Sequence, residues 1–314
     1  MKLILPVILI ILLFSCKPTQ PVSLPPANRQ LAITMDDPNS YDTPLMNWEE
    51  RNQRILDALD HHHIKAALFV CGMRVNDAAG SKILKSWDDK GHMICNHSFS
   101  HNYYNAKSQT ADAFIRDFRQ NDSLINGYSN YTRLFRFPFL KEGNTIGKRD
   151  SARMELNQSG YKNGYVTIDA SDWYIDTKIV EALRAKKDSD LTVYKDYYIH
   201  HIIDRAWYYD SLSGLLFHRE IKHTLLIHHS LLNALFLDDL LTALEKNGWQ
   251  LIDASEAYKD KVYRLQPEIV PCGESLIWQC AKLDPTLAPT LRYPGEDAEY
   301  EEQPLNTAIY NYSH

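Results

Sequence analysis

Residues 31–37, with the sequence LAITMDD, join a short apolar segment directly to two adjacent aspartates. The apolar part is typical of a buried strand, and residues 48–63, which follow, have the pattern of a helix. A second apolar segment, AALFV at residues 66–70, indicates another strand. A strand, a helix and a strand in this order predict two parallel strands with the helix packed outside them.

The same order of strand and helix recurs along most of the chain. Further strand-like segments lie at residues 93–95, 134–137, 165–168, 225–227 and 249–252, and helix-like segments at residues 82–90, 111–125, 151–158, 173–209 and 232–246. We therefore predict an α/β protein whose fold is a distorted (β/α) barrel of about seven parallel strands. A doubly wound open sheet is the competing architecture.

The first residues predict export and attachment to a membrane. Lys2 precedes an apolar run that is too short for a comfortable membrane-spanning helix and that ends in Ser15-Cys16. Residues 1–16 thus resemble a lipoprotein signal peptide in which Cys16 would carry the lipid, and residues 17–29 would form a flexible tether. This predicts a cell-envelope lipoprotein, anchored in a membrane and facing the periplasm or the cell surface. An ordinary signal peptide or an uncleaved anchor is the alternative.

The rest of the chain divides into two predicted parts. Residues 30–283 would form the main α/β domain, with a helical insertion at about residues 175–223. This insertion would either wall or cover a groove of that domain or serve only the structure. Residues 284–314 contain several acidic side chains and predict an irregular acidic C-terminal extension.

Composition and charge narrow the class of protein. The 314 residues are 44% hydrophobic and 24% charged, which is ordinary for a globular protein with a large core. A net charge of −6 argues against nucleic acid as a partner, because no basic stripe is available to neutralise phosphates. Cys71 and Cys95 lie in apolar segments and should be buried thiols, whereas export would permit a disulfide between Cys272 and Cys280. We expect a monomer.

Five groups of polar residues directly follow predicted strands. They are Asp36-Asp37, HSFSH at residues 97–101, RFPF at residues 136–139, DASDW at residues 169–173, and His228. The carboxyl ends of parallel strands meet at one edge of the sheet, where α/β folds place their active sites. We therefore expect these five groups to form one site.

The residue types in these groups suit a metal site. Two adjacent carboxylates repel each other, so a site that keeps both Asp36 and Asp37 usually holds a metal or gives the two different protonation states. By itself such a pair would more often be a turn or a helix cap. His97 and His101, four residues apart, could bind one metal from one side of a helical turn. Arg136 could hold a carboxylate through two hydrogen bonds.

Other histidines have simpler explanations. The run at residues 61–63 predicts a solvated helix end, and the pair at residues 200–201 predicts a polar helical face. Strand alternation would send His228 and His229 to opposite faces, so only one of them can act at the site.

In their order, these motifs resemble those of the polysaccharide deacetylase family, which is carbohydrate esterase family 4. The resemblance covers about residues 30–255, and its motifs are TMDD at residues 34–37, HSFSH at 97–101, RFP at 136–138, DASDW at 169–173 and LIH at 226–228. It implies one divalent metal ion, zinc or else cobalt or nickel, bound by Asp37, His97 and His101.

The resemblance also implies a role for each remaining motif residue. Asp36 would act as general base, with Arg136 holding it in place. The backbone N–H of Phe139 would help to stabilise the oxyanion. His228 would protonate the departing nitrogen, and Asp169 would favour its charged form.

Three positions depart from the family pattern. Pro38 follows Asp37 where glycine is common, so the adjacent loop should differ in shape. Phe139 replaces a common tyrosine, which leaves a backbone role unaffected. His229 stands where aspartate is frequent, and the register of the motif selects His228 as the acid.

The implied activity is removal of acetyl groups from the N-acetylated sugars of a polysaccharide or oligosaccharide, such as peptidoglycan or a chitin-like glycan. The alternatives are an O-acetyl esterase acting on xylan-like glycans, an amidase for small amides, and a glycan-binding lipoprotein without activity. A binding module has no need of a general base and a general acid, which favours an enzyme.

Overall fold

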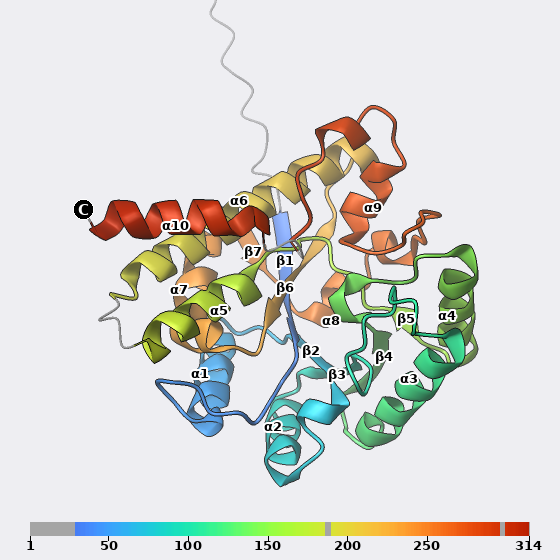
Figure 1. Cartoon of the computed structure of the whole chain (residues 1–314), viewed down its shortest axis with the longest axis horizontal. Coiled ribbons are helices and arrows are strands. Elements are labelled where there is room, and N and C mark those ends of the chain that lie inside the picture. The colour runs from blue at the N-terminus through green and yellow to red at the C-terminus, as the bar shows by residue number, and fades with distance from the viewer. Residues whose placement is uncertain (1–28, 186–189, 296–298, 314) are drawn as a thin grey trace, which may run out of the picture.

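The computed structural model describes residues 29–185, 190–295 and 299–313, which form a curled parallel sheet with helices around it (Figure 1). The strands are β1 (Arg29–Asp36), β2 (Ala67–Val70), β3 (Met93–Asn96), β4 (Tyr131–Phe135), β5 (Lys162–Asn163), β6 (Lys222–His228) and β7 (Trp249–Leu251). The α-helices are α1 (Trp48–His61), α2 (Ala78–Asp89), α3 (Ala111–Ile125), α4 (Ile146–Gln158), α5 (Asp172–Arg184), α6 (Thr192–Phe217), α7 (Leu231–Lys246), α8 (Ala254–Ala257), α9 (Leu276–Lys282) and α10 (Glu299–Ser313). Short 3₁₀ helices are η1 (Gly72–Arg74), η2 (Pro138–Leu140), η3 (Lys261–Arg264) and η4 (Ala288–Thr290).

The predicted signal peptide, with Cys16, and the tether up to residue 28 lie outside the described residues. Among the residues that are described, no helix combines the length and the apolar character needed to cross a membrane.

The sheet curls until its two edges are joined by one segment. The strand order is β5-β4-β3-β2-β1-β6, β7 pairs with the start of β1, and all pairings in this seven-stranded sheet are parallel. After β5 the chain crosses to the other edge, where Ile168 bridges Leu225 of β6. The predicted distorted (β/α) barrel is confirmed. The strand expected at residues 165–168 is reduced to this single bridge, because the segment crosses between the edges.

Alternation along β1 directs its last residue into the barrel. Leu31, Ile33 and Met35 lie in the main hydrophobic cluster, between the sheet and the helices, whereas Ala32 lies in a smaller cluster inside the barrel. Side chains of a strand point to alternate faces. Asp36 therefore shares the inward face with Ala32 and emerges at the carboxyl end of the barrel.

The same alternation separates the two histidines that end β6. Leu225 and Ile227 pack outward in the main cluster, so His228 points inward. His229 is buried on the outer side, where its Nε2 lies 3.2 Å from Asn52 Oδ1 of α1. The expected placement of the two histidines on opposite faces is what the structure shows.

The helices begin where polar side chains satisfy their first backbone N–H groups. In five helices that follow a strand, the N-cap side chain accepts a hydrogen bond from the N–H three residues later, and these N-caps are Asn47, Asp77, Thr110, Thr145 and Ser230. Such caps stabilise a helix start by about 1 kcal/mol each. Each of these helices follows a strand in the chain, so the caps fix the point at which the chain leaves the carboxyl end of the barrel.

The insertion at residues 175–223 is part of the structural framework. It forms most of α5 and all of α6, and buried residues of α6 such as Tyr198, Ile202 and Tyr209 belong to the main hydrophobic cluster. None of its described residues lines the active-site cleft. Of the two roles expected for this insertion, the structural one fits.

Residues 284–314 are more regular than the irregular extension expected for them. They include η4 and α10, and α10 packs beside α6 (Figure 1). Glu301 of α10 is fully buried, and the hydroxyls of Tyr197 and Tyr293 donate to its carboxylate at 2.8 and 2.7 Å. Part of the acidic composition of the predicted extension therefore forms an internal polar contact.

The four cysteines among the described residues are free thiols. Cys71 and Cys95 are buried in the core, as expected. Cys272 and Cys280 are also free, so the disulfide that export would permit is not formed.

Candidate active site

A cleft of about 350 Å³ lies at the carboxyl ends of the strands. It is lined by side chains from the predicted polar groups and their neighbours, namely Asp36, Asp37, Arg74, His97, His101, Phe137, Phe139, Leu140, Trp173, Leu226 and His228. Arg136 and Asp169 are buried and do not line it. The structure thus brings the five polar groups to one end of the barrel.

Asp37, His97 and His101 form the compact donor set of the cleft. One ligand atom from each residue lies within 4.8 Å of the other two. His101 Nε2 is 3.4 Å from Asp37 Oδ2, and His97 Nε2 is 3.6 Å from Asp36 Oδ2. Two imidazoles and a carboxylate are a donor set that zinc accepts while keeping a position open.

The segment that carries the two histidines is a loop, and the helical turn suggested by their spacing is absent. Ser98 and His101 have positive φ angles of 65° and 52°. Asp117 of α3 accepts hydrogen bonds from the N–H groups of Phe99 and Ser100 at 2.9 and 3.1 Å. This external carboxylate holds the loop, so the two histidines converge without a helix between them.

The two imidazoles are in the neutral form that metal binding requires. Burial lowers the pKa of both His97 and His101 to about 4. His97 Nδ1 donates to the carbonyl oxygen of Arg136 at 2.8 Å, which leaves the lone pair of Nε2 for a metal. Because the rings are neutral at neutral pH, their short distances to the aspartates are not ion pairs.

Asp37 is the carboxylate best suited to a cation. Burial would raise its pKa, but His101, His97 and Arg74 together hold that pKa below its ordinary value. Its Oδ1 is buried and accepts no hydrogen bond from the described residues, although Arg74 Nε lies 3.3 Å away. A buried carboxylate oxygen without a hydrogen bond, beside two neutral imidazoles, fits a divalent metal ion.

Asp36 lies beside this donor set and is paired with the guanidinium group of Arg136. Arg136 Nη1 donates to Asp36 Oδ1 at 2.5 Å. Burial raises the pKa of Asp36 to about 6, although the charge of Arg136 opposes the rise. A carboxylate with a pKa near neutrality can take up and release a proton during catalysis.

Arg136 is fixed on all sides. Its Nε donates to the carbonyl oxygen of Gly164 at 3.0 Å, and its Nη2 donates to Thr34 Oγ1 at 3.0 Å and to the Tyr258 hydroxyl at 3.2 Å. The guanidinium also lies over the Phe69 ring, 3.8 Å from its centroid. Arg136 therefore holds Asp36 in one orientation.

His228 is bound by Asp172, and this corrects the expectation that Asp169 would be its partner. His228 Nδ1 and Asp172 Oδ1 are 2.8 Å apart, and the backbone N–H of His228 donates to Asp172 Oδ2 at 2.8 Å. Burial alone would lower the pKa of His228, but the charge and hydrogen bond of Asp172 raise it to about 10. Nδ1 is engaged with Asp172, so Nε2 is the nitrogen that can deliver a proton into the cleft.

Asp169 instead organises the backbone behind the cleft. Its Oδ2 accepts a hydrogen bond from the N–H of Gly295 at 2.9 Å, and its carbonyl oxygen accepts one from Arg205 Nε at 3.1 Å. Gly295 in turn accepts a hydrogen bond from Ser171 Oγ at 2.8 Å. A Cβ at Gly295 would lie 2.7 Å from the backbone N of Ala170, so only glycine allows this approach. The segment that carries Asp172 is thus held by residues far along the chain.

Several residues of the site have strained backbones. Asp37, Phe139 and Leu140 have positive φ angles of 60°, 54° and 56°, as Ser98 and His101 also do. Non-glycine residues in this region persist only where the surroundings enforce it, and they cluster at functional sites. The ring of Phe139 packs edge-on against His101, with centroids 4.7 Å apart.

The loop after Asp37 is held by hydrogen bonds from α1 and from its own side chains. Arg51 of α1 donates from Nη2 to the backbone carbonyl of Asn39 at 2.6 Å and from Nη1 to that of Tyr41 at 2.5 Å. Asn39 Nδ2 donates to the carbonyl oxygen of Asp37 at 3.1 Å. The loop is therefore rigidly attached to the first helix.

Three functional neighbours were not found from the sequence. Arg74 lines the cleft beside Asp37, Asp117 holds the histidine loop, and Tyr258 supports Arg136. Each lies outside the motifs, and no local pattern marks it. Asp172 lies within the DASDW segment, and its position at the start of α5 was the available signal.

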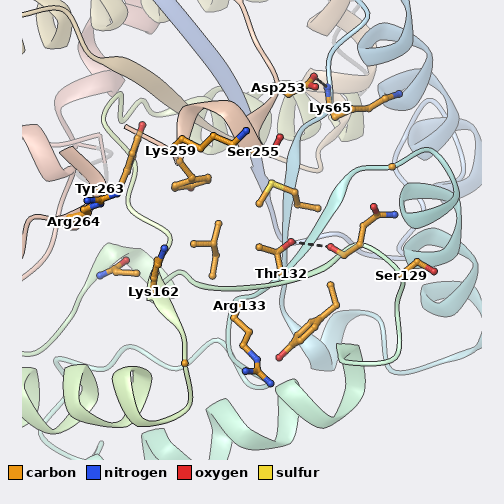
Figure 2. Close-up of a pocket in the computed structure, with 18 residues that line it drawn as sticks. Lys65, Ser129, Thr132, Arg133, Lys162, Asp253, Ser255, Lys259, Tyr263 and Arg264 are labelled. Carbon is orange, nitrogen blue, oxygen red and sulfur yellow. Dashed lines mark hydrogen bonds between the residues drawn. The ribbon is translucent and has the colours of Figure 1, made fainter. Parts of the chain in front are cut away.

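A larger cavity, of about 850 Å³, lies at the opposite, amino-terminal ends of β2 to β5 (Figure 2). Its charged lining consists of Lys65, Arg133, Lys162, Lys259 and Arg264 with one carboxylate, Asp253. No histidine is among the described residues that line it. The predicted base, acid and metal ligands line the smaller cleft instead.

Comparisons with known proteins agree with the motifs. Residues 24–164 match the sequence model of the polysaccharide deacetylase family. The chain is 27% identical over 156 residues to a peptidoglycan-N-acetylglucosamine deacetylase of Bacillus cereus, covering 49% of this chain and 51% of that protein. It is 27% identical over 212 residues to a peptidoglycan-N-acetylmuramic acid deacetylase of Bacillus subtilis, covering 68% of each. The match thus spans about half the length of the first relative and two thirds of the second.

Solved structures share the fold. A CE4-family pseudoenzyme from Bacillus anthracis has a TM-score of 0.51 at 18% identity, covering 74% of this chain and 66% of that chain. A mutant of this pseudoenzyme with restored enzymatic activity has a TM-score of 0.52 at 20% identity, covering 74% and 68%. At these identities the likeness establishes the fold alone.

The ordered motifs, the barrel with its cleft at the carboxyl ends of the strands, and the family match define one class. Residues 24–164 match the polysaccharide deacetylase family and both relatives are named peptidoglycan deacetylases, which agrees with the resemblance to carbohydrate esterase family 4.

Proposed function

We propose that this protein is a metal-dependent hydrolase that removes acetyl groups from N-acetylated sugars of a polysaccharide or oligosaccharide. The observation that carries the proposal is a base and an acid in one cleft beside a metal-binding donor set. Asp36 has a pKa of about 6 and His228 a pKa of about 10, so near neutral pH one is largely ionised and the other protonated. These are the states that hydrolysis of an amide requires at the outset.

The residues of the donor set fit a divalent metal ion, for which zinc is our first choice and cobalt or nickel the alternatives. Asp37, His97 and His101 would hold the ion, which would polarise the acetyl carbonyl and make water more acidic.

The chain's own groups would then move the protons. Asp36 would accept a proton from the attacking water as the water oxygen bonds to the acetyl carbon, and Arg136 keeps Asp36 directed at that water. The backbone N–H of Phe139 would donate to the oxyanion. As the carbon–nitrogen bond breaks, His228 would give its proton to the nitrogen, with Asp172 stabilising the imidazolium. The products are acetate and a free amino sugar.

The size of the cleft and the named relatives support a glycan substrate. A volume of about 350 Å³ is at the lower end of ordinary ligand pockets and suits one acetylated sugar unit. Trp173 and Phe139 supply apolar surface at its wall. The two bacterial relatives are named for peptidoglycan sugars, so we propose peptidoglycan as the first substrate to test, with chitin-like glycans second.

A structural neighbour that is a pseudoenzyme shows that this fold by itself does not imply activity. In this chain the base, the acid and the three metal-binding residues are all present in one cleft. A glycan-binding role without catalysis would leave the buried Asp36–Arg136 and His228–Asp172 pairs without a purpose.

We propose that the enzyme is anchored in the cell envelope through lipid on Cys16. The short apolar run before Ser15-Cys16 supports this proposal, and access to peptidoglycan would follow from it. Replacing Cys16 with alanine should release the protein from the membrane fraction. Continued membrane association of that variant would contradict the lipid anchor.

Acetate release tests the proposed activity. The purified protein, loaded with zinc or cobalt, is incubated with peptidoglycan, chitooligosaccharides and acetylated xylan, and Asp36→Asn serves as the control. We expect acetate from an N-acetylated glycan and none from the control. Acetate from xylan alone would instead favour the O-acetyl esterase, and no acetate from any substrate, despite bound metal, would contradict deacetylation of glycans.

A further inference from the structure

Two adjacent histidines and a carboxylate converge on the surface, far from the cleft residues. His61 ends α1, His62 follows it, and Asp238 lies on the neighbouring helix α7 (Figure 1). One ligand atom from each lies within 4.8 Å of the other two. The solvated helix end predicted for this run is wrong for His62, whose side chain is only 6% exposed.

The three donors surround a common point. His61 Nδ1 lies 2.6 Å and His62 Nε2 lies 3.4 Å from the same oxygen, Asp238 Oδ1. That oxygen is already engaged by His61. His62 Nε2 is buried and makes no hydrogen bond within the described residues, so two hydrogen bonds do not account for the cluster.

His62 has the arrangement of a metal ligand. Its Nδ1 lies 3.1 Å from Glu245 Oε2, in a hydrogen bond that leaves Nε2 with a free lone pair. Metal-binding histidines ordinarily donate their other ring N–H to a carboxylate or a carbonyl oxygen, which fixes the tautomer. His97 is held in the same way in the active site, by the carbonyl oxygen of Arg136.

The spacing on α7 explains how one helix supplies both carboxylates. Asp238 and Glu245 are about two helical turns apart and therefore lie on one face of α7. Glu245 can thus orient His62 from one side while Asp238 faces both imidazoles from the other.

We propose that His61, His62 and Asp238 bind a second divalent metal ion of the zinc type, which joins the end of α1 to α7. Two imidazole nitrogens and one carboxylate oxygen are ligands that zinc accepts, and the exposed edge leaves a position for water. Calcium and magnesium prefer oxygen ligands alone, so they should not compete effectively. None of the three residues lines the active-site cleft, so we assign the ion a structural role, which is to stabilise the packing of the two helices.

This inference goes beyond the proposed function and does not depend on it. α1 follows the loop after Asp37, and α7 follows His228, so the ion would connect the two helices that leave the active-site strands. The bound ion would raise the Tm of the protein, because a ligand that binds only the folded chain stabilises it by mass action.

The test is a count of bound metal in protein without a histidine tag. The protein is stripped with a chelator, equilibrated with zinc, freed of excess zinc by gel filtration, and measured by plasma mass spectrometry. We expect two zinc ions per chain in the natural protein, one in His62→Ala, one in His97→Ala, and none when both changes are combined.

A matched control separates this site from general histidine content. His63 stands next to the cluster with a positive φ of 54°, which asparagine tolerates, so His63→Asn should keep two ions. Asp238→Asn provides an independent variant at an exposed position and should lose the same ion as His62→Ala. Zinc should raise the Tm of His97→Ala through the second site, and this rise should vanish when His62→Ala or Asp238→Asn is added.

The result that would overturn the proposal is retention of zinc by the double variant of His62 and His97, or a single ion in the natural protein that only His97→Ala removes. If instead the active site binds no metal, the natural protein should hold one zinc ion, which His62→Ala removes and His97→Ala does not.

Discussion

The two histidine–carboxylate clusters of this protein use the same side chains in opposite surroundings. In the active site the side chains of His97 and Asp37 are 2% and 12% exposed, whereas those of His61 and Asp238 are 68% and 55% exposed and only that of His62, at 6%, is buried. Burial lowers the pKa of His97 to about 4, while the hydrogen bond with Asp238 raises the pKa of His61.

Burial therefore decides what such a cluster can do before a metal arrives. The buried imidazoles are neutral and adjoin a base, an acid and a cleft, so a metal there can take part in a reaction. In the exposed cluster a metal would compete with protons for His61, and none of the cluster's residues lines the cleft. The same ligands thus support chemistry in one place and helix packing in the other.

The largest expected effect is loss of a ligand in the buried cluster. His97→Ala should remove the active-site metal and lower kcat/KM about a thousandfold or more, because a metal contributes several kcal/mol and each 1.4 kcal/mol is tenfold. Acetate release and metal content measure the two effects. His200→Ala, at an exposed position on α6, is the control and should change neither. Full metal content in His97→Ala would refute the ligand assignment.

The next effect separates the base from the ligands. Asp36→Asn keeps the size of the side chain and lies outside the donor set, so metal content should stay unchanged. Loss of a general base should lower kcat/KM by about 10²–10⁴-fold. Near-normal turnover with metal bound would remove Asp36 from the mechanism.

A smaller effect tests which aspartate serves His228. Asp172→Asn removes the charge that raises the pKa of His228 to about 10, so that pKa should fall. The protonated acid is then lost at a lower pH, and the alkaline limb of kcat/KM should move down in pH. The loss at neutral pH should be smaller than the full contribution of a general acid, which is about 10²–10⁴-fold. In the companion variant, Asp169→Asn, the limb should stay nearly in place, and the reverse pattern would restore Asp169 as the partner.

The smallest effect is expected at the exposed cluster. His62→Ala should leave kcat/KM within about twofold, since no residue of this cluster lines the cleft, and should lower Tm in zinc by a few degrees at most. His63→Asn should match the natural protein in both measurements. A large loss of turnover in His62→Ala would show that the two clusters are coupled, and it would contradict a purely structural role for the exposed cluster.

The sequence was sufficient for those parts of the site that strand geometry controls. The alternation of β1 and β6 follows directly from their residues, and it places Asp36 and His228 at the inner face of the barrel end. Because parallel strands bring their carboxyl ends together, the convergence of the polar groups could also be expected.

What could not be predicted depends on contacts between distant segments. Asp169 and Asp172 are both plausible partners for His228, and only the placement of α5 against β6 selects Asp172. The segment at residues 165–168 has a typical strand composition, yet its crossing between two edges leaves one bridge. The acidic residues of α10 suggested an irregular extension, whereas hydroxyls of Tyr197, from a distant helix, and of Tyr293 donate to Glu301 in the interior.

The contact of Gly295 with the segment at residues 169–173 sets an order in time. Every residue proposed to act in the cleft, from Asp36 to His228, is synthesised before Gly295. Until that late glycine docks, Asp169 and Ser171 lack the partners that hold the segment carrying Asp172. A growing chain therefore contains all the proposed reacting groups before the segment that carries Asp172 is held in position. We expect activity to appear only after the late part of the chain has folded onto the barrel.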